Sequence, residues 1–288
     1  MEEYLRDLEK RQELEKAPCA AVFMLGSEEM LKVQYGGHPW LMRVRCELPT
    51  RPLGPGGEEE PVRATYISAD SEADAQRYQT FVDAMKTIDV HRCAHLKLAA
   101  PSARALAHLE ESDIVALGDG PHVDKTWHLL EHGDECVLER FKWRYYSGAV
   151  LLGIGSGGQF VSERWWVGNP KEELESNAAL GAGEPDPHKH APTEGRYIGG
   201  KATAIVPWMV TSVDEHAEAI AELLGFGSMA VVLPRRGAVI FNTDGALEPC
   251  GSMLVEYKND YKRGGVQMGM LVIASECFRL LLSAFDGF

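Results

Sequence analysis

AVLLGIGSGGQFV, at residues 149–161, carries the strongest structural signal in the chain. The apolar run 149–152 is followed by four glycines within the six residues 153–158, and apolar residues resume at Phe160. This pattern predicts a buried strand that turns sharply into a helix. In hydrolases such a turn is the nucleophile elbow, which carries a Ser or Cys at its tip. The residue at the tip therefore determines whether this turn can perform covalent chemistry.

Steric requirements place the tip of the turn. Strand and helix nearly touch at an elbow, so the residues two before and two after the tip must be small. If Ser156 were the tip, one flanking residue would be Ile154, whose β-branched side chain fits poorly. If Gly155 is the tip, the flanking residues are Gly153 and Gly157, and both fit. The sequence thus predicts a tip without a nucleophile.

The rest of the chain predicts an α/β fold. Strand-like and helix-like segments alternate from residue 20 to the elbow, which predicts a parallel sheet covered by helices on both faces. In the C-terminal third, short apolar segments separated by turns predict antiparallel edge strands. These segments are MAVVL (229–233), GAVIFN (237–242), SMLVEY (252–257) and MGMLVIA (268–274). We expect a helical appendage over 1–16 and a single doubly wound domain over 17–288.

Composition excludes several classes of function. The net charge of −14 repels phosphate backbones and anionic membrane surfaces, so we expect neither nucleic-acid nor membrane binding. No apolar run reaches the roughly 18 residues of a transmembrane helix. The six cysteines form no CxxC pair, which argues against a disulfide framework or a zinc site and fits a cytoplasmic protein. The sequence implies no metal and no cofactor.

The elbow resembles the cyanophycinase and dipeptidase E (aspartyl dipeptidase) family of serine peptidases. In that family a strand is followed by Gly-Thr-Ser-Ala-Gly-Ala, in which the Ser is the nucleophile. Laid without a gap on residues 153–158, the pattern places Gly155 at the nucleophile position and Ser156 after it. The resemblance implies a class I glutamine amidotransferase-like, flavodoxin-like fold. Family members are often dimers, so we also expect a homodimer.

A second part of the resemblance concerns the oxyanion hole. DIVALGDGP, at 113–121, is similar to the family's strand and glycine-rich turn that supply part of this hole. The corresponding residues are Gly118, Asp119 and Gly120, with Ser156 beside them. Asp119 stands where the family carries glycine, and a carboxylate there would repel a developing oxyanion.

A third part concerns the catalytic His. AIVPWMVTSVDEH, at 204–216, is similar in outline to the family segment that carries Asp-x-His. With two extra residues, Asp214 and His216 match the family's Asp and His. Without a gap, Ser212 and Asp214 take those positions and the His is lost. The arginines that follow the His in the family are absent from residues 217–224.

Three functions follow from these patterns. Loss of the nucleophile costs about 10⁶ in turnover in a serine protease, so the first hypothesis is an inactive homologue with a binding or assembly role. Its partner would be an unknown protein or an acidic peptide ligand. The alternative is an active serine hydrolase that uses Ser156 with His216 as base. A second alternative is a small-anion or nucleotide-binding module at the glycine-rich turn, although GIGSGG lacks the Lys-Ser/Thr of a P-loop.

Overall fold

The computed structural model describes the core of the chain. The described residues are 20–35, 37–48, 60–69, 73–120, 123–133, 135–159, 164–165, 193–194, 203–207, 229–243, 247–251, 254–260 and 265–271. The helix expected over 1–16 and the candidate residues Ser212, Asp214 and His216 lie outside them. Within the described residues, no helix has the length and apolar character that crossing a membrane requires.

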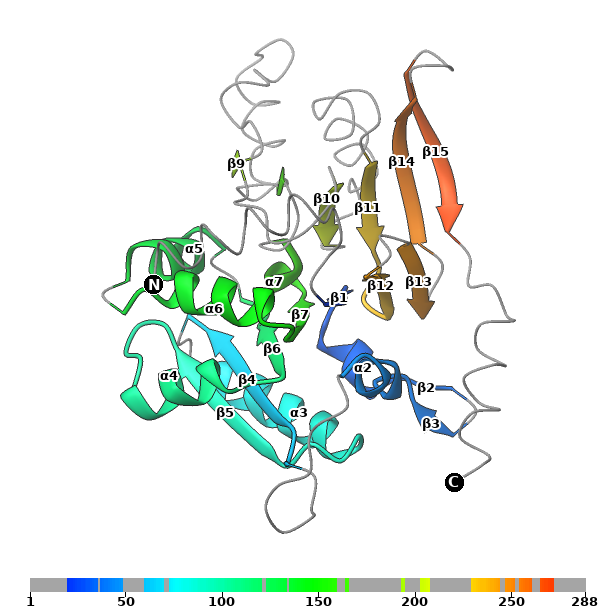
Figure 1. Cartoon of the computed structure of the whole chain (residues 1–288). Helices are drawn as coiled ribbons and strands as arrows, with labels where there is room; N and C mark the ends of the chain where they lie inside the picture. Colours follow the sequence, from blue (N-terminus) through cyan, green and yellow to red (C-terminus); the bar gives the residue numbers. More distant parts are fainter. Residues whose placement is uncertain are drawn as a thin grey trace.

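A seven-stranded sheet organises the fold, in the order β13-β12-β1-β7-β6-β4-β5 (Figure 1). Its strands are β1 (Val22–Leu25), β4 (Arg63–Ser68), β5 (Arg92–Lys97), β6 (Ile114–Leu117), β7 (Val150–Ile154), β12 (Gly237–Phe241) and β13 (Leu247–Gly251). Five neighbouring strands of this sheet run parallel to one another, in the order β1, β7, β6, β4 and β5. Strand β12 pairs antiparallel with β1, and β13 pairs antiparallel with β12. The predicted α/β class, with a mostly parallel sheet and antiparallel edge strands, is confirmed.

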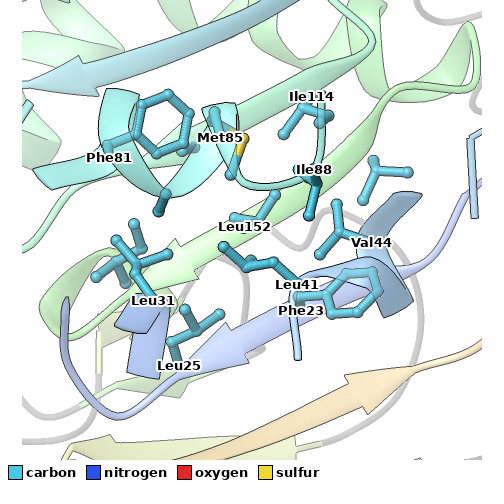
Figure 2. Close-up of a cluster of buried hydrophobic side chains, with 14 of the residues drawn as sticks. Phe23, Leu25, Leu31, Leu41, Val44, Phe81, Met85, Ile88, Ile114 and Leu152 are labelled. Atoms are coloured by element: carbon cyan, nitrogen blue, oxygen red, sulfur yellow. The ribbon is translucent and has the colours of Figure 1, made fainter. Parts of the chain in front are cut away.

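Helices cover both faces of this sheet. The helices are η1 (Glu28–Lys32), α2 (Met42–Cys46), α3 (Asp74–Lys86), α4 (Ala103–Glu110), α5 (Val123–His132), α6 (Val137–Tyr146) and α7 (Ser156–Gln159). The cluster on one face includes Phe81 of α3 and Leu41 next to α2 (Figure 2). The cluster on the other face includes Leu106 of α4 and Phe141 of α6. Neighbouring strand residues alternate between the two clusters, which explains why these strands read as continuous apolar runs.

A second sheet, which the sequence did not predict, contains most of the remaining described strands. Its order is β15-β14-β11-β10-β8-β9. The strands are β8 (Arg164–Trp165), β9 (Thr193–Glu194), β10 (Thr203–Pro207), β11 (Met229–Leu233), β14 (Leu254–Asp260) and β15 (Gly265–Leu271). Strands β14 and β15 form the antiparallel edge of this sheet, as Figure 1 shows, whereas β11 runs parallel to β10. A short pair, β2 (Gln34–Tyr35) and β3 (His38–Pro39), completes the described strands.

Candidate functional site

Polar residues gather where the parallel strands of the central sheet end. Glu28 follows β1, Asp74 begins the helix after β4, Asp119 follows β6, and Gly155 and Ser156 follow β7. Ligands of open α/β sheets bind outside the carboxyl ends of the strands, where the strand order reverses. The order reverses here at β4, because the chain proceeds from β4 outward to β5 and then returns to β6 and β7. This carboxyl edge is therefore the candidate site.

The backbone of the elbow has its left-handed residue at Gly155, where φ is +55°. Ser156 is not among the described residues with positive φ. A Cβ built on Gly153 would overlap Gly158 Cα and lie 2.9 Å from Gly158 N. A Cβ on Gly157 would overlap the Leu117 carbonyl. The glycines on both sides of Gly155 are thus needed for the close approach of strand and helix.

The Asp119 carboxylate fills the space beside the tip. A Cβ built on Gly155 would lie 2.5 Å from Asp119 Oδ1 and 2.8 Å from Oδ2, well inside van der Waals contact. A side chain at position 155 and the Asp119 carboxylate therefore cannot occupy their places together. Sequence reasoning noted the charge of Asp119 but did not predict that its side chain would lie at the tip.

Ser156 joins the two turns of the site. Its backbone N–H donates to Asp119 Oδ1 at 3.0 Å, and its Oγ accepts from Gly120 N–H at 2.8 Å. The Ser156 hydroxyl lies 3.0 Å from both Asp119 Oδ1 and the Gly120 carbonyl, so it donates its one hydrogen to either of these acceptors. The residue is only 5% exposed. No His belongs to this hydrogen-bond set within the described residues.

The same bonds occupy the donors that an oxyanion hole would use. An elbow supplies the N–H of the residue after the tip, and a neighbouring loop supplies a second N–H. Here the Ser156 N–H binds the Asp119 carboxylate, and the Gly120 N–H binds the Ser156 hydroxyl. Both donors are satisfied by groups of the chain itself. These two N–H groups would also be needed by the small-anion module considered above.

A group of charges next to the elbow was missed by sequence reasoning. Arg77 Nη1 lies 3.3 Å from Asp74 Oδ1, and Arg77 Nε lies 3.6 Å from Glu28 Oε1. Burial raises the pKa of Glu28, and the carboxylates of Asp119 and Asp74 act in the same direction, whereas Arg77 and Lys32 oppose them. The signal that could have found Glu28 and Asp74 is their position just after strand-like segments.

Tyr66 of β4 lies beneath the turn that carries Asp119. Its side chain is fully buried, and its ring packs against Phe81 with centroids 5.3 Å apart. A Cβ on Gly118 would overlap the Tyr66 hydroxyl, so the turn passes directly over it. Within the part of the chain that the structure describes, the hydroxyl has no hydrogen-bond partner. Burial, together with the nearby carboxylates of Glu28, Asp74 and Asp119, raises the pKa of Tyr66.

A separate Ser–His pair lies on the same face of the sheet as Tyr66. Ser68 Oγ is 2.9 Å from His95 Nε2, and Ser68 is 3% exposed. The His95 ring stacks on Tyr78 with centroids 4.7 Å apart. These contacts hold the imidazole in place, and they make Ser68 a second serine that any test with a serine-reactive reagent must distinguish from Ser156.

The structure brings together five of the predicted site residues, namely Gly118, Asp119, Gly120, Gly155 and Ser156. It does not describe Asp214 or His216, so their roles stay predictions. Among the described residues, no group of three or more His, Cys, Asp or Glu side chains could hold a metal ion.

Comparisons with known proteins give a limited result. No protein-family model matches the chain, and no curated protein matches it in sequence. Fourteen chains of solved structures match it in fold. One is the "Putative Peptidase E Protein" of Listeria monocytogenes EGD-e, with 11% identity and a TM-score of 0.48 over 81% of this chain and 98% of that one. A similarity of this level transfers no residue role, and the site must be interpreted from its own geometry.

Proposed function

We propose that this protein is a catalytically inactive relative of the cyanophycinase and dipeptidase E serine peptidases, with a binding or assembly role. The observation that carries the proposal is the Asp119 carboxylate beside Gly155. The tip has no nucleophilic atom, and the neighbouring space that a tip side chain needs is filled. Acyl-enzyme chemistry requires an attacking atom at this point.

The hydrogen bonds of the elbow support the same proposal. A tetrahedral intermediate needs free donors aimed at its oxyanion. The Ser156 N–H already binds a carboxylate, and a substrate oxyanion in that position would meet the negative charge of Asp119. Stabilisation of an oxyanion would therefore require Asp119 to leave.

The active alternative, with Ser156 as nucleophile and His216 as base, is less well supported. The Ser156 hydroxyl is nearly inaccessible, and it is bonded to Asp119 and Gly120. To attack a substrate it would have to break the contacts that join the two turns. We therefore retain the inactive relative as the single proposed function.

Labelling of the purified full chain with a fluorophosphonate tests the proposal, with the modified peptide mapped by mass spectrometry. Hydrolysis of aspartyl dipeptides is measured in parallel. We expect no labelling of Ser156 or Ser68 and no hydrolysis above the buffer rate. Stoichiometric labelling of Ser156 that is lost on heat denaturation and in Ser156→Ala would overturn the proposal.

The proposal also includes the partners implied by the resemblance and the composition. We propose a cytoplasmic homodimer that binds a protein or a peptide. Sedimentation equilibrium of the full chain is expected to give twice the monomer mass, and a monomer mass across micromolar concentrations would contradict the dimer.

A further inference from the structure

Next to the saturated elbow lie three acceptor atoms without hydrogen-bond partners. Among the described residues, the buried Glu28 Oε1 and the buried Tyr66 hydroxyl have none. Asp119 uses Oδ1 for Ser156, and its Oδ2 accepts no hydrogen bond from the described residues. Buried polar atoms are nearly always paired, so unpaired ones need an explanation.

The charges around these atoms favour a cation. Among the described residues, the carboxylates of Glu28, Asp74 and Asp119 act on the Tyr66 hydroxyl, and the cation Arg77 opposes them. Arg77 is already engaged with Asp74, and it reaches Glu28 only at 3.6 Å. A buried carboxylate that is not well paired is costly. A further positive group at this position would lower that cost.

We propose that the carboxyl edge between β1, β4 and β6 binds a primary ammonium group through Glu28, Asp119 and the Tyr66 hydroxyl. An ammonium group has three N–H donors and no acceptor, which matches three acceptors that carry net negative charge and accept no hydrogen bond from the described residues. This inference deepens the proposed function and rests on it in one respect, because the ligand is bound and not cleaved.

Two of the side chains around the site are partly exposed. Glu28 and Arg77 are each about a quarter exposed, and both are long side chains at the surface of the site. The Tyr66 hydroxyl is buried directly against Gly118. A primary ammonium group can donate hydrogen bonds to these acceptors, whereas a quaternary ammonium group has no N–H to donate.

The proposed ligand differs from the acidic peptide expected from the resemblance. Carboxylates of a ligand would face Glu28, Asp74 and Asp119, and like charges in a partly buried site repel. Metal ions are a poor alternative, since the described residues offer no group of three metal-ligating side chains. An amine can come from an aliphatic side chain such as lysine or from a peptide amino terminus.

Thermal unfolding of the full chain with three salts at equal ionic strength tests the inference. The probes are butylammonium chloride, glycinamide hydrochloride and tetramethylammonium chloride. We expect at least one of the first two to raise the midpoint by about 2–5 °C near saturation, and the third to leave it unchanged. Butylammonium alone would identify an aliphatic amine, and glycinamide alone a peptide amino terminus.

Two variants and one control locate the effect. Tyr66→Phe and Glu28→Gln are expected to lose most of the amine-induced shift. Tyr145→Phe, at another fully buried tyrosine on α6, is expected to keep it. An equal shift with tetramethylammonium, no shift with either amine, or an undiminished shift in Tyr66→Phe would overturn the inference. So would stabilisation by sodium N-acetylaspartate, measured at the same ionic strength, in place of the amines.

The two proposals fail separately. If the protein binds no amine and fluorophosphonate does not label it, the proposed ammonium site is disproved and the proposal of an inactive relative stands. If fluorophosphonate labels Ser156 and the protein binds the amine, the proposal of an inactive relative is disproved and the ammonium site stands.

Discussion

The elbow and the adjoining group around Glu28 and Tyr66 lie at the same edge of one sheet, but they differ in how their buried polar groups are hydrogen-bonded. At the elbow, the Ser156 N–H and hydroxyl and the Gly120 N–H are all bonded within the chain. In the adjoining region, Glu28 Oε1 and the Tyr66 hydroxyl are buried without hydrogen bonds. Hydrogen-bonded groups stabilise a fold, whereas buried groups without hydrogen bonds cost free energy and call for an explanation. We therefore expect a ligand to bind beside Glu28 and Tyr66 and not at Gly155.

The largest effect is expected from a side chain at the tip. Gly155→Ala adds a Cβ in a left-handed conformation and within 2.5 Å of the Asp119 carboxylate. We expect a loss of about 3 kcal/mol in the free energy of unfolding, from roughly 1–2 of backbone strain and 1–3 of overlap. Urea denaturation measures it. Gly37→Ala, also at positive φ but with no atom near the added Cβ, should show only the strain.

A smaller loss is expected when the link between the two turns is removed. Ser156→Ala leaves the Gly120 N–H without its acceptor and removes the hydroxyl donor to Asp119 or Gly120. Unsatisfied buried groups cost about 1–3 kcal/mol, and the same denaturation experiment reports the change. The exposed Ser147, whose hydroxyl donates to the Trp143 carbonyl, provides a matched control that should lose less than about 0.5 kcal/mol. Equal losses for both serines would contradict the structural role of Ser156.

Tyr66→Phe should behave in the opposite way from Ser156→Ala. It removes a buried hydroxyl that has no partner, so it is expected to be neutral or to stabilise the free protein by up to about 1 kcal/mol. Chemical denaturation without added amine is the appropriate measurement. A clear destabilisation would mean that the hydroxyl has a partner, and the contrast between the two regions would disappear.

The smallest effect is expected from the charge of Glu28. Burial raises the pKa of this group in the folded state, so ionisation at neutral pH costs stability that returns as the pH falls through the raised pKa. Glu28→Gln is therefore expected to stabilise the protein slightly at pH 7–8. Its advantage should shrink as the pH falls through the raised pKa, and it should vanish below the unfolded pKa of about 4.3. A variant that loses stability increasingly as the pH rises would show that the ion pair with Arg77 outweighs burial.

The sequence predicted the parts of this molecule that depend on local pattern. The apolar strands, the α/β class and the glycine spacing of the elbow could be predicted, because periodicity and the size of Gly153 and Gly157 express them directly. The second sheet could not be predicted. Strands β11 and β12 follow each other in the sequence but belong to different sheets. The alternation of residues along a strand does not show which sheet the strand joins.

The site was predicted only in part for a similar reason. The elbow turn and the 118–120 turn carry glycine signals, whereas Glu28, Tyr66 and Arg77 look like ordinary residues of a helix or a strand. Their importance arises from the meeting of β1, β4 and β6 at one edge, and strand order is a tertiary property. The overlap of Asp119 with a tip side chain depends on the same packing.

A double-mutant cycle at the elbow tests the central claim most directly. The account holds that the Asp119 carboxylate occupies the space that a side chain at position 155 would need. Free energies of unfolding are measured for the wild type, Gly155→Ala, Asp119→Ala and the double variant. We predict that the double variant loses at least about 1 kcal/mol less than the sum of the single losses, because neighbours that overlap are coupled. If the loss in the double variant equals the sum of the single losses to within about 0.5 kcal/mol, the two positions are not coupled and the claim is contradicted.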